Sequence, residues 1–254
     1  MNRSSIGTGD TSKPSTTSTT ATTIGTEHHR VAIVKSGKKK KKPHLTPEQF
    51  AQIIDGIPEP YATMVYVSVW TGLRVSELAA LKWGDVHEDS LTIDERYCRG
   101  DWGAPKSEAS NATIGADLEV IERIHRLQEL TVTVRAGRAK RKYRVVKSSK
   151  PDDLVFQSVR KGAPMRDNNM LSRHIKPAAR AVKLDFVNWR CLRTSRATWM
   201  VEAGANPKDV QGQMRHSRIS TTMDIYASSF LNRRGEPWTK LARWSSAGRR
   251  QCSN

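Results

Sequence analysis

From about residue 44 onward, apolar side chains recur at helical spacing in short segments separated by turn residues. The first segment, "LTPEQFAQIIDGI", has Thr46 as an N-terminal cap, Pro47 at the first helical position and Gln49 three residues after the cap. This pattern predicts a series of helices. "PYATMVYVSVW" is nearly continuous apolar, which fits a buried helix or a strand, and we interpret it as a helix. Further helices are expected at "LRVSELAALKW", "ADLEVIERIHRLQEL", "NNMLSRHIKPAARAV", "CLRTSRATWMVEAG" and "NPKDVQGQM".

Short β-branched segments lie between these helices. "DSLTIDERYCR" and "ASNATIGA" are separated by polar "GDWGAPKSE", which predicts strands joined by a hairpin or a small sheet. A further strand is expected at "LVFQSV", and "RAGRAKRKYRVVKSSKPDD" before it is interpreted as a basic loop. The predicted fold class is mainly α with a small peripheral antiparallel β-sheet (α+β).

Composition divides the chain into three parts. Residues 1–43 are rich in Thr and Ser and end in "KSGKKKKKP", so they bury too little apolar surface to order themselves. We expect a disordered tail and a basic linker that also touches the DNA backbone. Residues 44–228 form one principal domain, because 254 residues with 37% hydrophobic content suffice for one ordinary core. Residues 229–254 are an atypical basic C-terminal tail.

The charge balance indicates an anionic partner. The chain has 43 Lys and Arg residues against 25 Asp and Glu residues, a formal net charge of +18. Double-stranded DNA is the favoured partner, and an acidic membrane surface is the alternative. We expect a cytoplasmic protein, because there is neither a run of 18 apolar residues nor a signal peptide. Three cysteines without CxxC spacing and the absence of metal-ligand spacing predict neither metal nor cofactor.

A tyrosine near the end of the domain raises the question of nucleophilic chemistry on phosphate. Attack on a phosphodiester by a tyrosyl oxygen needs cationic donors, an acid for the leaving alkoxide and help in deprotonating the phenol. Arg74 and Arg193 are the candidate donors, and His216 precedes Tyr226 by ten residues. Taken singly, each of these residues also has an ordinary structural interpretation.

The ordered set is more specific than its members. "TGLRVSELAALKWGDV", "APKSEASNATI" and "NWRCLRTSRATWMVEAGANPKDVQGQMRHSRISTTMDIYA" resemble, in order and spacing, the catalytic-domain motifs of the tyrosine recombinase (phage integrase) family. The resemblance covers roughly residues 44–228. It implies the catalytic-domain fold of that family.

The resemblance also implies roles for individual residues. Arg74 and Arg193 correspond to the two arginines that clamp the scissile phosphate. Lys106 corresponds to the hairpin lysine that protonates the departing 5′ oxygen, and an ordinary loop lysine is the alternative. His216 corresponds to the histidine that hydrogen-bonds the phosphate and assists proton transfer. Tyr226 corresponds to the nucleophile that forms a 3′-phosphotyrosyl link.

The chain departs from the family pattern at Arg190, at Arg215 and in the segment before residue 44. Arg190 occupies the position where histidine or lysine is usual; it can donate to phosphate but cannot shuttle a proton at neutral pH. Arg215 replaces the usual glycine, and we expect a phosphate contact from it rather than crowding of the backbone. Glu77 could orient Arg74 or be a surface acid. Family members usually carry an N-terminal core-binding domain of roughly a hundred residues, and this sequence has only residues 1–43 there.

The function implied is that of a DNA strand transferase of a phage or other mobile element. It would be a site-specific recombinase or integrase that cleaves and rejoins DNA as a homo-oligomer. Two alternatives stay open: a catalytically impaired DNA-binding remnant that lacks the core-binding domain, and a DNA-relaxing enzyme resembling type IB topoisomerases.

Overall fold

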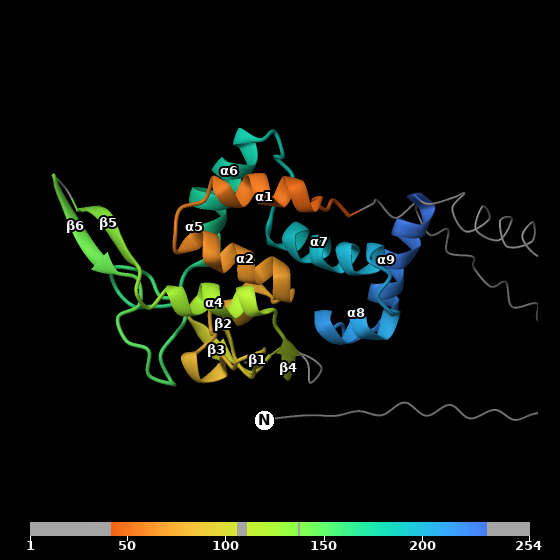
Figure 1. The fold of residues 1–254 in the computed structure, drawn as a ribbon, viewed down its shortest axis with the longest axis horizontal. Coiled ribbons are helices and arrows are strands. Elements are labelled where there is room, and N and C mark those ends of the chain that lie inside the picture. Colours follow the sequence, from red (N-terminus) through yellow and green to blue (C-terminus); the bar gives the residue numbers. More distant parts are fainter. Residues whose placement is uncertain (1–41, 106–110, 137, 233–254) are drawn as a thin grey trace, which may run out of the picture. The chain divides into compact units, whose positions relative to one another are not determined.

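The computed structural model describes residues 42–105, 111–136 and 138–232 (Figure 1). The predicted N-terminal tail up to residue 41, Lys106 and the C-terminal tail from residue 233 lie outside the described residues. The helices are α1 (Pro47–Asp55), α2 (Tyr61–Thr71), α3 (Val75–Leu78), α4 (Leu118–Arg126), α5 (Asp167–Met170), α6 (Lys176–Ala181), α7 (Trp189–Glu202), α8 (Pro207–Met214) and α9 (Ile219–Asn232). The strands are β1 (Ser90–Ile93), β2 (Arg96–Cys98), β3 (Asp101–Gly103), β4 (Ala112–Gly115), β5 (Thr131–Ala136) and β6 (Ala139–Arg144).

Helix α1 begins as its sequence predicts. The Thr46 hydroxyl accepts a hydrogen bond from Gln49 N (3.3 Å), and Gln49 Oε1 accepts one from Thr46 N (3.0 Å), which completes a capping box. Just before the cap, Leu45 O accepts from Trp199 Nε1 (2.7 Å) and Leu45 N donates to Ser195 Oγ (2.8 Å). The start of α1 is thereby attached to α7.

Helix α2 is the centre of the main core. Nine of its eleven residues are buried, because it packs against α1, α4 and α7. A helix that is apolar on all sides is stable only in such a position. Gly72 ends α2 in the left-handed region, with φ of 70°. A Cβ atom at Gly72 would lie 2.7 Å from Met214 Sδ, so glycine allows the end of α2 to approach the end of α8 closely.

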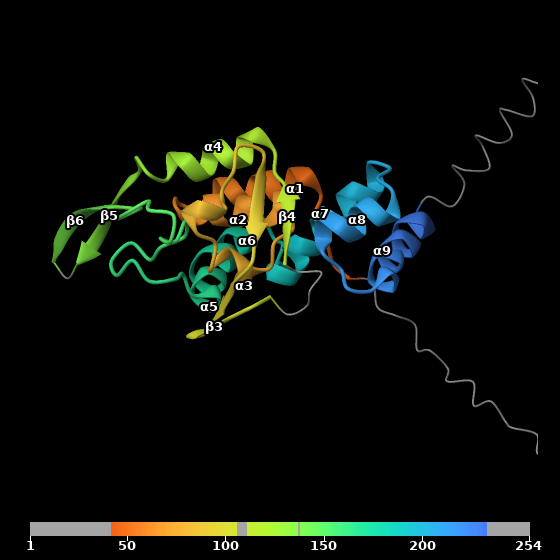
Figure 2. The same ribbon diagram turned by 90° about the horizontal axis from the view of Figure 1, so that it is seen from below.

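The predicted fold class is confirmed, since the described residues form mainly helices and three two-stranded antiparallel sheets. The pairing of the strands is more specific than predicted. β1 pairs with β4, with Leu91 opposite Ile114, whereas β2 and β3 form a separate hairpin inserted between them. Figure 1 shows β1 to β4 on the side of α2 that is opposite α1. Figure 2, seen from below, shows these strands in front of α2.

Three local predictions were wrong. The helix expected over "LRVSELAALKW" is only α3, and Leu81 O instead accepts a hydrogen bond from Val155 N (2.9 Å). The strand expected at "LVFQSV" forms only isolated bridges, of Leu154 with Lys82 and of Gln157 with Pro164. The segment interpreted as a basic loop contains most of the hairpin β5–β6. The alternation in "TVTV", which directly precedes that segment and begins β5, is a strand signal.

Candidate active site

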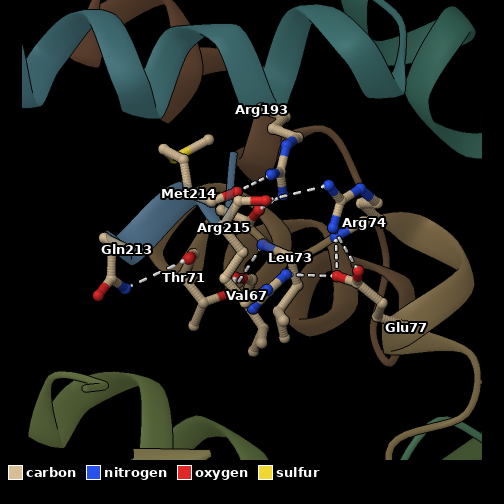
Figure 3. Close-up of polar contacts among 10 residues, drawn as sticks. Val67, Thr71, Leu73, Arg74, Glu77, Arg193, Gln213, Met214 and Arg215 are labelled. Atoms are coloured by element: carbon tan, nitrogen blue, oxygen red, sulfur yellow. Dashed lines mark hydrogen bonds and ion pairs between the residues drawn. The ribbon is translucent and has the colours of Figure 1, made fainter. Parts of the chain in front are cut away.

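Arg74 is held at the start of α3 by the buried carboxylate of Glu77. Glu77 is only 2% exposed. Its Oε2 accepts from Arg74 N (2.8 Å), and its Oε1 pairs with Arg74 Nη1 (2.7 Å) (Figure 3). The prediction that Glu77 orients Arg74 is therefore confirmed. The alternative, that Glu77 is a solvated acid on the surface, is wrong.

Arg193 projects from the middle of α7 toward the same place. Its Nη1 donates to Gly72 O and its Nη2 donates to Met214 O (Figure 3). These bonds fix the guanidinium between the end of α2 and the end of α8. Burial, together with the nearby charges of Arg74 and Arg215, lowers the pKa of Arg193 to about 9, so it is still cationic at neutral pH.

Arg215 lies at the C-cap of α8 in the left-handed conformation, with φ of 48° and ψ of 49°. A glycine at this position would adopt that conformation without strain, which explains the usual family residue. The Arg215 side chain is 2% exposed and its Nη2 forms an ion pair with Glu77 Oε2. The predicted phosphate contact from Arg215 is wrong, because its guanidinium is buried behind Glu77. Its backbone carbonyl accepts from Arg74 Nη2 (3.3 Å).

His216 follows directly and is half-buried. Its backbone N donates to Gln211 O (3.1 Å), and its Nδ1 lies 3.0 Å from Thr222 Oγ1, so the ring is positioned from both α8 and α9. Burial and the charges of Arg193 and Arg74 lower the pKa of His216 to about 4. The imidazole is neutral at pH 7.

A cleft of about 430 Å³ brings four of the predicted residues together. Its lining includes Arg74, Arg190, Arg193 and His216. Arg190 is exposed, whereas Arg193 is held inside the cleft. Sequence reasoning missed the lining residues Lys42 and Trp189. Lys42 ends the lysine run that was interpreted as linker, and nothing in the pattern singles out Trp189.

Tyr226 is not among the residues that line the cleft. It is 7% exposed, and its hydroxyl donates to Ala205 O, in the turn between α7 and α8. Its ring belongs to a small apolar cluster with Ala197, Val201, Val210, Met214 and Ile225. Burial, followed by the charge of Asp209, raises its pKa. The structure thus brings Arg74, Arg193 and His216 together in the cleft, whereas Tyr226 packs in the apolar cluster outside the cleft lining.

No group of His, Cys, Asp or Glu residues in ranges 42–105, 111–136 and 138–232 could hold a metal ion. Likewise, none of the helices in these ranges combines the length and the apolar character needed to cross a membrane.

The fold is that of tyrosine recombinase catalytic domains. The Tn1549 transposon integrase, solved in complex with transposon right end DNA, superposes with a TM-score of 0.58 and 20% identity, over 77% of this chain and 67% of that one. The XerA recombinase superposes with a TM-score of 0.55 and 19% identity, over 73% of this chain and 60% of that one.

Sequence comparison then defines the family. The model of the phage integrase family matches residues 43–233, so the chain belongs to that family. The ICEBs1 integrase of Bacillus subtilis is 25% identical over 212 residues, which are 80% of this chain and 55% of that protein. The integrase of Mycobacterium phage L5 is 22% identical over 203 residues, which are 79% of this chain and 53% of that protein. The chain spans about half the length of these curated relatives.

The lowered pKa of His216 predicts a stability that depends on pH. In the unfolded chain the imidazole has its ordinary pKa of 6.5, whereas in the fold the pKa is about 4. The stability that neutral His216 allows is fully present above pH 6.5 and is lost as the pH falls toward 4. Between these two pH values the imidazole takes up a proton in the unfolded chain and stays neutral in the folded protein, so protonation favours unfolding. We expect the free energy of unfolding to fall over this range by up to about 3 kcal/mol more than in His216→Gln. Urea unfolding of both proteins at several pH values measures this difference, and parallel curves would contradict it.

Proposed function

We propose that the protein is a site-specific DNA recombinase that cleaves and rejoins strands through a 3′-phosphotyrosyl intermediate at Tyr226. The observation that carries this proposal is the cleft in which Arg74, Arg193 and His216 meet. Donors fixed before the reaction stabilise the charge that develops on phosphate, and each is worth about 3 to 4 kcal/mol in the transition state. Residues 44–228 would form the catalytic domain.

The cleft is suited to a phosphodiester in charge and in donor geometry. Arg74 and Arg193 carry two positive charges on the lining of the cleft, and the Glu77 carboxylate pairs with Arg74 and with Arg215, which is buried behind it. Burial and the positive charges of neighbouring arginines lower the pKa values of Arg193 and His216. A phosphate bound in the cleft would bring negative charge next to these cations. Arg190, an exposed residue of the cleft lining, would add a further donor but no proton transfer.

In the cleavage step the Tyr226 oxygen attacks phosphorus. A bond forms between phosphorus and the phenolic oxygen, and the bond between phosphorus and the 5′ oxygen breaks. The phenolic proton passes to a base, for which neutral His216 is the candidate within the cleft, and the departing 5′ oxygen takes a proton from an acid, for which we propose Lys106. Rejoining reverses these transfers with a 5′ hydroxyl as the attacking group, so no external energy source is consumed.

Tyr226 has to move before it can react. In the structure its hydroxyl is bonded to Ala205 O, while the adjacent Ile225 lines the cleft. A rearrangement of the first turns of α9 would exchange these two side chains. The same observation favours a second candidate function, that of a DNA-binding remnant in which the tyrosine no longer reaches the phosphate.

Double-stranded DNA is the proposed partner. The Tn1549 integrase was solved with transposon right end DNA, and the XerH recombinase was solved bound to a palindromic difH substrate. We also propose that copies of the chain act together on DNA, because strand exchange joins ends from two duplexes.

Covalent trapping tests the proposed function. The full chain would be mixed with a pool of nicked duplexes that carry a randomised central segment, so that the cleaved fragment dissociates and the adduct persists. We expect a protein–DNA band that survives denaturing electrophoresis, with the DNA located on Tyr226 by peptide mass spectrometry. Products that join two duplexes would separate recombination from relaxation. A folded protein that binds the pool and gives no adduct would contradict the proposal and favour the remnant.

A further inference from the structure

The β5–β6 hairpin presents a continuous cationic face. Its strands pair antiparallel, so residues opposite each other share a face of the ribbon. Every second pair along the hairpin lies on the same face, and one face contains three such pairs. All six side chains of these pairs are exposed. The pairs are Thr131 with Arg144, Thr133 with Lys142, and Arg135 with Lys140.

The other face of the hairpin is partly covered by the protein. Val132, Val134 and Tyr143 are all half-buried, and Val132 packs against the main core. Arg141, which pairs with Val134 on this face, is exposed, so this face is covered only in part, whereas all six side chains of the cationic face are exposed to solvent. Both ribbon views show the hairpin extending beyond the helices that surround α2 (Figure 1, Figure 2).

The charge of this segment is of one sign. Residues 130–151 contain eight Lys and Arg residues and no Asp or Glu. None of the ion pairs found among the described residues involves the hairpin. Arg135 and Lys140 lie directly opposite each other, an arrangement that destabilises a two-stranded sheet. A solvated surface would be more stable with mixed signs, so this arrangement favours an anionic partner.

We propose that the cationic face of the β5–β6 hairpin is a second DNA-binding surface, separate from the cleft that holds Arg74 and Arg193. The partner is double-stranded DNA, which makes this inference rest on the proposed function. Lys and Arg side chains bind phosphate oxygens without reading sequence. A two-stranded ribbon also has dimensions that the major groove admits. The hairpin therefore adds affinity, while the reaction stays at the cleft.

The test compares two variants of the full chain that lose the same charge. The hairpin variant is Arg135→Gln, Lys140→Gln and Lys142→Gln. The control variant is Arg126→Gln, Arg180→Gln and Lys183→Gln, at three exposed positions outside the hairpin. Binding to a 40-base-pair duplex would be measured at several salt concentrations. Three lost phosphate contacts predict a salt slope that is smaller by about 2.7 and a dissociation constant raised at least about tenfold near 50 mM salt.

The outcomes separate this inference from the proposed function. An unchanged slope in the hairpin variant, or equal losses in both variants, would overturn the inference. The thermal midpoint of the hairpin variant should stay the same or rise, because a like-charge pair is removed. At protein concentrations that saturate the DNA, the hairpin variant should still form the covalent adduct. If wild type gives no adduct at all, the binding measurements still decide the role of the hairpin.

Discussion

Phenylalanine in place of Tyr226 is expected to abolish the covalent protein–DNA product completely while leaving the fold and DNA binding nearly unchanged. The substitution removes the only atom that could attack phosphorus from this side chain. It also removes the hydrogen bond to Ala205 O, which contributes about 0.5 to 1.5 kcal/mol to stability. The ring stays in its apolar cluster. Trapping on nicked duplexes, with urea unfolding in parallel, measures both effects.

Tyr66→Phe is the matched control for this experiment. Tyr66 is also buried, at 9% exposure, and its ring packs against Phe50 and Trp70 in the main core. The control should lose a comparable amount of stability and keep the full yield of adduct. An adduct that persists in Tyr226→Phe would assign the nucleophile to another residue.

The burial of Tyr226 has a consequence for reactivity. Burial raises the pKa of the phenol, so in this conformation it is a weaker nucleophile than a tyrosine in water. Beside Arg74 and Arg193 the opposite would hold, because positive charge favours the phenolate. The protein is thus expected to combine an inert tyrosine away from DNA with an activated one in the cleft.

The helices were the most predictable part of the fold. α1 was expected from its cap and its apolar spacing, and α4 from its apolar spacing; both signals act within a few residues of the chain. α7 and α8 were also expected as helices. The β5–β6 hairpin was missed because its charges outweighed a short alternating signal. The segment at Val155 and Phe156 looked like a strand because its apolar run reflects burial, and burial alone does not supply a pairing partner.

The site was predictable as a set of residues and less so as a geometry. Arg74, Arg193 and His216 were expected to meet because their motifs occur in the family order, and the cleft contains all three. The direction of the Arg215 side chain depends on a left-handed backbone and on a buried partner far away in sequence. The position of Tyr226 depends on how α9 packs against α7 and α8. Neither is encoded in local spacing.

Glu77→Gln is expected to lower the free energy of unfolding by about 3 to 5 kcal/mol, because removing one partner of a buried ion pair leaves the other charge uncompensated. That charge is Arg215, which is 2% exposed. Glutamine keeps the size of the side chain, so lost packing contributes little. Urea unfolding at pH 7 measures the change. Glu119→Gln is the control: its pair with Arg123 has a carboxylate that is 57% exposed, and it should cost less than about 1 kcal/mol.

Adding Arg215→Met to Glu77→Gln tests whether the unpaired, buried charge of Arg215 causes the loss of stability. Arg215 Nε and Nη1 have no hydrogen-bond partner in the described part of the chain, so its guanidinium is costly to bury even in wild type. Methionine removes that cost, and the double variant should recover most of the stability lost in Glu77→Gln. It should not recover cleavage, because Arg74 still lacks the carboxylate that orients it. A double variant that is less stable than either single one would show instead that Arg215 is held mainly by packing, and that Glu77 acts on Arg74 alone.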